Sequence, residues 1–297
     1  MSLELKDFIS TPLSDEPSAT RVFIEQILEL DAVQHALKFG GWLAGGSIAY
    51  AIHSGEKGLK HYGDILKGDI DVFFSDQQNA LAAAGTFEDY AESLQSRPGR
   101  RRYNTMVSPS KFAFNILPRR NYWEKEIKQG VEDSVANIQY ITHPNFCAPS
   151  PLHNISSFDL VASMAATDGK QVWRHKDLQQ LQSKRLLRIA RSDTPFLASR
   201  VIKYLIKDRG YDSLEEGSNE KVHEWFYRAV TDNFTGFEKK SIDSYHVMKK
   251  LWDCGLMEPG MLPLLVGKIT DWERRGGYGG RSFRVDWATK KIVESGG

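Results

Sequence analysis

A glycine turn followed by a pair of aspartates most constrains what this chain can fold into. Gly45-Gly46-Ser47 comes directly after a short apolar segment, Trp42 to Ala44, and directly before residues with helical spacing. Asp69 and Asp71 stand in the run Gly-Asp-Ile-Asp-Val-Phe-Phe, whose β-branched and aromatic residues predict a strand. The order strand, turn, helix, loop and strand indicates a domain built around a sheet.

The two aspartates are expected to share one face of their strand, because alternate side chains of a strand point the same way. Two carboxylates on one face repel each other unless a positive group lies between them. Magnesium prefers oxygen ligands and is often held by one or two carboxylates together with phosphate oxygens. Asp69 and Asp71 are therefore candidate metal ligands, although such a pair alone is also typical of a solvated strand face.

The glycine turn supplies a second kind of group. Glycines let a backbone approach a ligand closely, and the N-terminus of a helix favours an anion. Gly45, Gly46 and Ser47 are therefore candidates to hold the phosphates of a nucleoside triphosphate. The same residues also fit an ordinary turn, with Ser47 as a helix cap.

A third carboxylate is expected on a neighbouring strand if two metal ions clamp an in-line displacement. Asp159 is the candidate, because Phe158 to Val161 reads as a short strand running into Ala162 to Ala166. Asn137 to Thr142 reads as the strand before it. Asp159 can equally serve as a cap.

The order of these motifs resembles the DNA polymerase β-like nucleotidyltransferase superfamily, whose signature is a glycine turn followed by an acidic pair on a strand. The residues of these motifs are most similar to those of nucleotidyltransferase-like proteins of viruses and bacteriophages. The resemblance covers roughly residues 40–165. It implies a small mixed sheet with flanking helices, two Mg²⁺ ions on Asp69, Asp71 and Asp159, and a triphosphate held by Gly46 and Ser47.

The basic stretch from Arg97 to Arg120 has seven Lys or Arg residues and no acidic residue. It can hold a triphosphate or a nucleic-acid backbone, or it can be a solvated loop between strands. Lys111 or Arg119 is placed to reach a phosphate, and Phe112 to Leu117 reads as a strand inside the stretch.

The fold class expected is α+β, with a nucleotidyltransferase-like domain at residues 1–169 and a mainly helical domain at 170–297. Helices are expected at Arg21 to Phe39 and Gln77 to Leu94 in the first domain. In the second, they are expected at Asp177 to Ile189, Phe196 to Lys207, Glu220 to Val230 and Ser241 to Leu251, with a short strand at Val285 to Trp287.

The amino-acid composition excludes few classes of binding partner. The 297 residues carry a net charge of +1, and the two cysteines have neither disulfide-framework nor metal-ligand spacing. No run approaches the ~20 apolar residues of a membrane span, and no signal peptide is visible, so a cytoplasmic protein without membrane partners is expected. Phosphate-loop, nucleophile-elbow and kinase signatures are absent from the sequence.

The hypothesis is metal-dependent transfer of a nucleoside monophosphate from an NTP to an acceptor hydroxyl, with release of pyrophosphate. The sequence does not decide whether the acceptor is an RNA or tRNA end, a protein or a small molecule. The residues around Tyr50 lack the paired basic residues found after the glycines in many superfamily members. The alternative is therefore a catalytically silent binding or assembly protein of the same fold. A metal-dependent nuclease ranks last, because it leaves the glycine turn unexplained.

Overall fold

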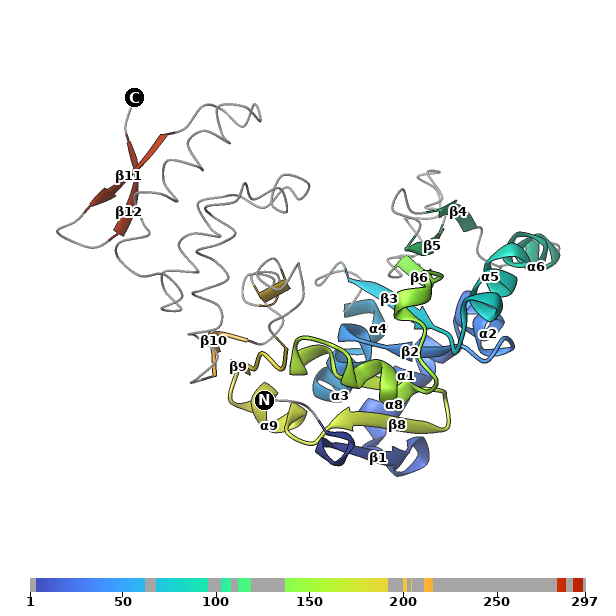
Figure 1. Cartoon of the computed structure of the whole chain (residues 1–297), viewed down its shortest axis with the longest axis horizontal. Helices are drawn as coiled ribbons and strands as arrows, with labels where there is room; N and C mark the ends of the chain where they lie inside the picture. The colour runs from blue at the N-terminus through green and yellow to red at the C-terminus, as the bar shows by residue number, and fades with distance from the viewer. Residues whose placement is uncertain are drawn as a thin grey trace. The chain divides into compact units, whose positions relative to one another are not determined.

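The computed structural model describes residues 4–61, 68–95, 103–107, 112–118, 137–191, 200–201, 204, 211–215, 282–286 and 291–295 (Figure 1). The chain divides into two compact units, Met1–Gln182 and Ser183–Gly297. The boundary expected near residue 170 stays a prediction, although β8 (Gln171–His175) already belongs to the sheet of the first unit.

A mixed eight-stranded sheet organises the first unit, in the order β1-β8-β7-β2-β3-β6-β5-β4. β3 and β6 pair in parallel, and all other neighbours in this sheet pair antiparallel. Besides β8, its strands are β1 (Phe8–Pro12), β2 (Trp42–Ala44), β3 (Asp69–Phe73), β4 (Tyr103–Val107), β5 (Ala113–Pro118), β6 (Asn137–Ile141) and β7 (Ala165–Thr167).

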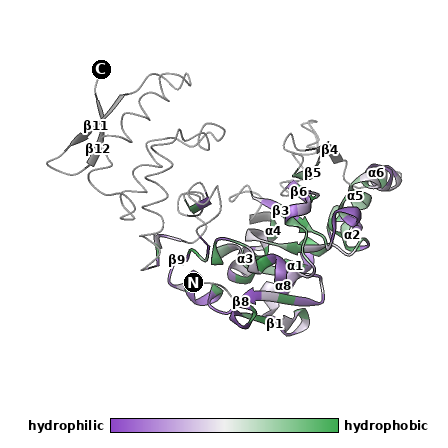
Figure 2. Ribbon diagram, in the orientation of Figure 1, coloured by the Kyte–Doolittle hydropathy of each residue, from purple (hydrophilic) through white to green (hydrophobic). Residues whose placement is uncertain are grey.

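Helices flank this sheet, as the expected fold class requires, and the prediction of a mixed sheet with flanking helices is confirmed. The α-helices are α1 (Ser18–Leu28), α2 (Asp31–Leu37), α3 (Gly46–Ser54), α4 (Gly58–His61), α5 (Gln77–Gly85), α6 (Phe87–Gln95), α8 (Pro151–Ser156) and α9 (Leu178–Ser183). Short 3₁₀ helices are η1 (Leu5–Asp7), η2 (Leu13–Asp15), η3 (Gly55–Lys57), η5 (Pro144–Phe146) and η6 (Val161–Ser163). Hydrophobic residues predominate along α3, whose middle is buried (Figure 2).

One face of the sheet is closed by α2 and α6. Ile70 and Val72 of β3 and Tyr140 of β6 are fully buried on this face. The Tyr140 hydroxyl donates a hydrogen bond to the carbonyl of Ala32 in α2, and its ring packs edge-on against Phe87 of α6. These contacts form an aromatic core under the strands that carry the two aspartates.

The opposite face is covered differently along the sheet. α8 packs on β2, β7 and β8, and Trp42 Nε1 donates to Asn154 Oδ1 of α8 over 3.2 Å. Further along, Phe73 of β3 meets Phe158, with ring centroids 5.8 Å apart. Asp69 and Asp71 lie on this same face of β3 and are only half-buried.

Two long helices expected from the sequence are each divided. The helix expected at Arg21 to Phe39 becomes α1 and α2, because Leu30 takes an extended backbone and buries its side chain. Gln34 Nε2 donates to the carbonyl of Leu28 over 2.6 Å, which satisfies the end of α1. The helix expected at Gln77 to Leu94 divides at Thr86 into α5 and α6.

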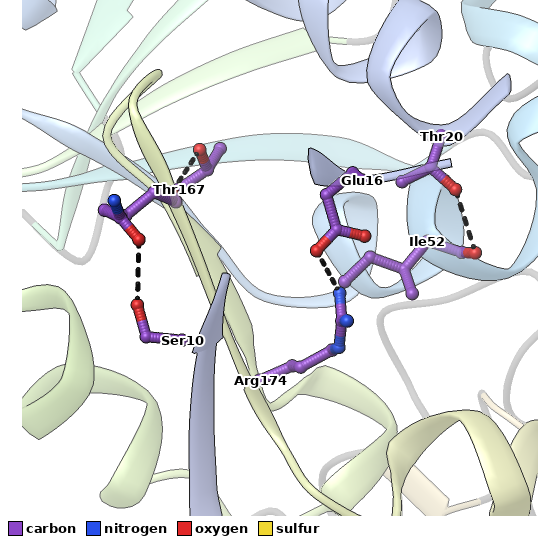
Figure 3. A network of polar contacts seen from close by, with 7 residues as sticks. Ser10, Glu16, Thr20, Ile52, Thr167 and Arg174 are labelled. Atoms are coloured by element: carbon purple, nitrogen blue, oxygen red, sulfur yellow. Dashed lines mark hydrogen bonds and ion pairs between the residues drawn. The ribbon is translucent and has the colours of Figure 1, made fainter. Parts of the chain in front are cut away.

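A buried ion pair joins the start of α1 to the sheet. Arg174 Nη1 of β8 lies 2.6 Å from Glu16 Oε1, and their side chains are 10% and 0% exposed. Figure 3 shows the two side chains pointing toward each other beside Thr20, whose hydroxyl donates to the Ile52 carbonyl over 3.4 Å. The pair therefore fixes α1, and through Thr20 the end of α3, against the β7–β8 hairpin.

His35 of α2 is a buried titratable group in the first unit. Its Nε2 lies 3.1 Å from both the Ala83 carbonyl and Thr86 Oγ1, and its ring packs among Phe39, Phe87 and Tyr90. Burial lowers the pKa of His35; the hydrogen bond to Ala83 opposes this, and the nearby Lys38 adds to it. The folded state thus favours the neutral imidazole.

We expect the free energy of unfolding to fall as the pH drops below about 6.5, the ordinary histidine value. The reason is that unfolded His35 binds a proton more readily than folded His35, so stability rises with pH in this window. Urea titrations between pH 5 and 8 would measure it. His35→Gln should flatten the dependence and His153→Gln, at an exposed histidine of α8, should keep it. An unchanged slope in His35→Gln would contradict the assignment.

The described part of the second unit contains two small sheets. β9 (Leu186–Leu187) pairs in parallel with β10 (Ser213–Leu214), and β11 (Ser282–Asp286) pairs antiparallel with β12 (Lys291–Ser295). The helix expected at Asp177 to Ile189 is shortened to α9, since β9 replaces its second half. Apart from residues 200, 201 and 204, the other helices expected here lie outside the described residues. Within the described chain, no helix combines the length and apolar character needed to cross a membrane.

Candidate phosphate and metal site

Gly45 begins α3 in a backbone conformation that requires glycine. Its φ of 103° and ψ of −157° lie in a region that is essentially restricted to glycine. Its amide donates to the Ala165 carbonyl of β7 over 2.8 Å, which holds the turn on the sheet. The glycine at this position is therefore needed for the chain to leave β2 and enter α3 directly.

The register of β2 and β3 brings the glycine turn to the aspartates. Ala44 pairs with Asp71 across the two antiparallel strands, so Gly45 follows the residue opposite Asp71. A Cβ placed on Gly45 would lie 3.7 Å from Asp71 Oδ2. The two motifs that are separated in sequence are thus adjacent in the fold.

Asp71 belongs to a row of polar side chains that crosses three strands. Asp71 pairs with Gln139 of β6, and Gln139 pairs with Asn115 of β5, so the three side chains share one face. Gln139 Nε2 donates to Asn115 Oδ1 over 2.8 Å. These two amides are not among the candidate residues named from the sequence. Asn115 interrupts an apolar strand, and this is the signal that identifies it in hindsight.

Ser47 is the second residue of α3 and not its N-cap. Gly45 is the N-cap, and Ser47 makes no capping hydrogen bond. The side chain is 2% exposed, and its Oγ has no hydrogen-bond partner among the described residues. A buried hydroxyl without a partner costs free energy unless a ligand or water satisfies it. Because the first amides of a helix have no acceptor within the helix, the same holds for the first amides of α3, a helix of nine residues.

The prediction that Asp159 lies on a strand is wrong. Asp159 lies in a bend between α8 (Pro151–Ser156), which Ser150 caps, and η6 (Val161–Ser163). Its side chain is 1% exposed. No three His, Cys, Asp or Glu side chains of the described residues form a group that can hold a metal ion. Asp159 as third ligand therefore stays a prediction.

Lys111 and the other six basic residues of the stretch lie outside the described residues, so their role also stays a prediction. Within the stretch, Tyr103–Val107 and Ala113–Pro118 form β4 and β5, which pair with each other at one edge of the sheet. The strand expected at Phe112 to Leu117 is thereby confirmed.

The oxygen donors of this site suit a divalent cation. Asp69 and Asp71 are half-buried neighbours on one strand face, and Mg²⁺ is commonly bound through one or two carboxylates completed by phosphate oxygens and water. The amides at the start of α3 suit those phosphates. The residues present therefore fit a metal and phosphate pair, with the carboxylates of Asp69 and Asp71 as candidate ligands.

Among the comparisons with known proteins, the one with solved structures finds similar chains. No protein-family model matches the chain, and no curated protein matches it. A CCA-adding enzyme with ATP gives a TM-score of 0.45 at 15% identity, covering 89% of this chain and 55% of that one. The enzyme with CTP gives 0.44 at 13%, covering 90% and 56%.

The Thermotoga maritima CCA-adding enzyme complexed with tRNA gives 0.42 at 13% identity, covering 89% of this chain and 55% of that one. This chain thus spans little more than half the length of the chains it matches. Similarities at TM-scores below 0.5 support no conclusion about activity, substrate or metal.

Proposed function

We propose that the first unit transfers a nucleoside monophosphate from an NTP to an acceptor hydroxyl, with release of pyrophosphate. The observation that supports this proposal is that the Gly45 turn is adjacent to Asp71, so that the first amides of α3 and the carboxylates of β3 could act on one triphosphate. Neither part alone distinguishes this chemistry from a structural role. Their adjacency across β2 and β3 supports it, because both parts must act on the same triphosphate.

Each residue has a role in this proposal. Asp69 and Asp71 hold divalent cations, and Gly45, Gly46 and Ser47 bind the β- and γ-phosphates through backbone amides and the Ser47 hydroxyl. Bound Mg²⁺ would neutralise charge on the leaving pyrophosphate and activate the acceptor. The protein contributes mostly by positioning the triphosphate and by preorganised electrostatics. Asp159 as a ligand on the acceptor side and Lys111 on the triphosphate complete the set as further predictions.

A catalytically silent protein of the same fold is the second candidate. The observation that favours it is that the described Asp, Glu, His and Cys residues do not gather three ligands for a metal. This candidate binds a nucleotide or a partner without turnover, and its Ser47 hydroxyl would still be satisfied by a bound phosphate.

Label transfer separates the two candidates. The full-length protein would be mixed with Mg²⁺, each α-labelled NTP and fractionated cell extract, with the Asp69→Asn/Asp71→Asn protein in parallel. We expect label to enter one acceptor class, whether RNA, protein or a small molecule, with wild type alone.

Nucleotide binding would be measured in the same preparations by equilibrium dialysis. A folded wild-type protein that binds NTP but transfers no label to any fraction would contradict the transferase and support the silent protein. Equal labelling by the double variant would remove the two aspartates from the mechanism.

A further inference from the structure

An aromatic cluster lies at the end of β6, separate from the aspartates. Phe112, His143 and Phe146 contact one another, with ring centroids 4.8 Å apart for Phe112 and His143, 5.7 Å for His143 and Phe146, and 5.9 Å for Phe112 and Phe146. Phe112 directly precedes β5, and Phe146 ends η5. Three rings from two segments distant in sequence thus form one contiguous group.

This cluster is exposed, unlike the aromatic core on the other face of the sheet. Phe112 is 43% exposed and Phe146 is 46% exposed, and His143 is half-buried. The backbone beneath them is fixed, since the amides of Thr142 and His143 both donate to the Phe112 carbonyl, over 3.0 and 3.2 Å. Single exposed apolar residues are normal, but a contiguous exposed group on a rigid base indicates a binding surface.

The cluster lies near the site along one strand. Gln139 of β6 is paired with Asp71, and His143 follows four residues later. At about 3.3 Å per residue along an extended chain, His143 is roughly 13 Å further on. A flexible chain that places its end at Asp71 can therefore reach the rings with its next few units.

The sequence around Phe112 favours an anionic partner, although its basic residues lie outside the described part of the chain. Phe112 belongs to the Arg97 to Arg120 stretch, which has seven basic residues and no acidic residue. Aromatic rings beside positive charge are the combination that binds unpaired nucleic-acid strands, because bases stack on the rings while phosphates pair with Lys and Arg. Recognition of single-stranded RNA also stacks unpaired bases on Phe and His rings.

We propose that Phe112, His143 and Phe146 form a stacking site for unpaired bases of a single-stranded nucleic acid. That this strand is the acceptor rests on the proposed transferase function. The binding itself does not, because it needs neither NTP nor the two aspartates.

The test is the affinity of the full-length protein for fluorescent 12-nucleotide RNA and DNA homopolymers, measured by anisotropy at low salt without NTP or Mg²⁺. Phe112→Ala/Phe146→Ala should weaken binding about 5- to 100-fold, the range measured for loss of base stacking on an aromatic ring. Phe112→Trp should retain it. Leu81→Ala, which removes another exposed apolar side chain in α5, should leave it unchanged.

An abasic oligonucleotide makes the test specific for stacking. Wild type should bind the abasic oligonucleotide as weakly as the double alanine variant binds the intact strand. The double alanine variant should bind the abasic and the intact strands with equal affinity. Asp89→Asn, at an exposed site in the first turn of α6, should bind the intact strand like wild type, and because the assay contains no NTP a failed transferase leaves this test valid. Equal affinity of the double alanine variant and wild type, or no binding of either nucleic acid by wild type, would overturn the proposal.

Discussion

Asp71→Asn is expected to lower the rate of nucleotidyl transfer about a thousandfold or more, with the free energy of unfolding within about 0.5 kcal/mol of wild type. The carboxylate lies against the Gly45 turn and is half-buried. Its loss removes a charge from the proposed cation site, and bound metal ions can supply several kcal/mol of transition-state stabilisation. About 4 kcal/mol corresponds to a factor of about 10³ in rate.

Stability is expected to survive this change for an electrostatic reason. Asp69 and Asp71 repel each other on one strand face, so neutralising either relieves repulsion in the folded state. Asp89→Asn makes the same charge change at an exposed site in the first turn of α6, and it should leave transfer unchanged. Initial rates with labelled NTP and urea titrations of the same preparations measure both quantities. Transfer by Asp71→Asn at a wild-type rate would refute the role of this carboxylate.

The parts of the site that the sequence predicts are those that depend on local pattern. The strand containing Asp69 and Asp71 follows from its β-branched residues, and the helix after Gly46 follows from its spacing. The order of the motifs favours a common site for the glycine turn and the aspartates. The register that pairs Ala44 with Asp71 is a tertiary property, and no local pattern in the sequence predicts it.

Other elements were misjudged because tertiary contacts override local preference. Phe158 to Val161 has the composition of a strand, yet Ser150 caps a short helix before it, and η6 follows it. Leu30 continues the apolar spacing of α1 but leaves the helix to bury its side chain. The polar row from Asp71 to Asn115 was missed because its members come from three strands.

In contrast to Asp71→Asn, Arg174→Met is expected to lower the free energy of unfolding by several kcal/mol. Glu16 has a fully buried side chain, and Arg174 Nη1 is its ion-pair partner at 2.6 Å. Removing one member of a buried pair leaves an uncompensated charge, which costs about 3–5 kcal/mol. Glu16→Leu/Arg174→Met should recover most of this loss, because replacing both charges with apolar groups is often neutral.

Lys176→Met is the matched control, because Lys176 pairs with Asp7 over 2.7 Å with side chains 48% and 21% exposed. Partly exposed pairs contribute about 1 kcal/mol or less, so this variant should remain close to wild type in urea titrations. Arg174 also pairs in register with Ala165, whose carbonyl holds the Gly45 amide. Because this pairing is made by the backbone and not by the side chain, transfer by folded Arg174→Met should persist at temperatures well below its midpoint, whereas Asp71→Asn should stay about a thousandfold slower or more at every temperature. A loss below about 1 kcal/mol in Arg174→Met would show that the ion pair does not fix α1 to the sheet.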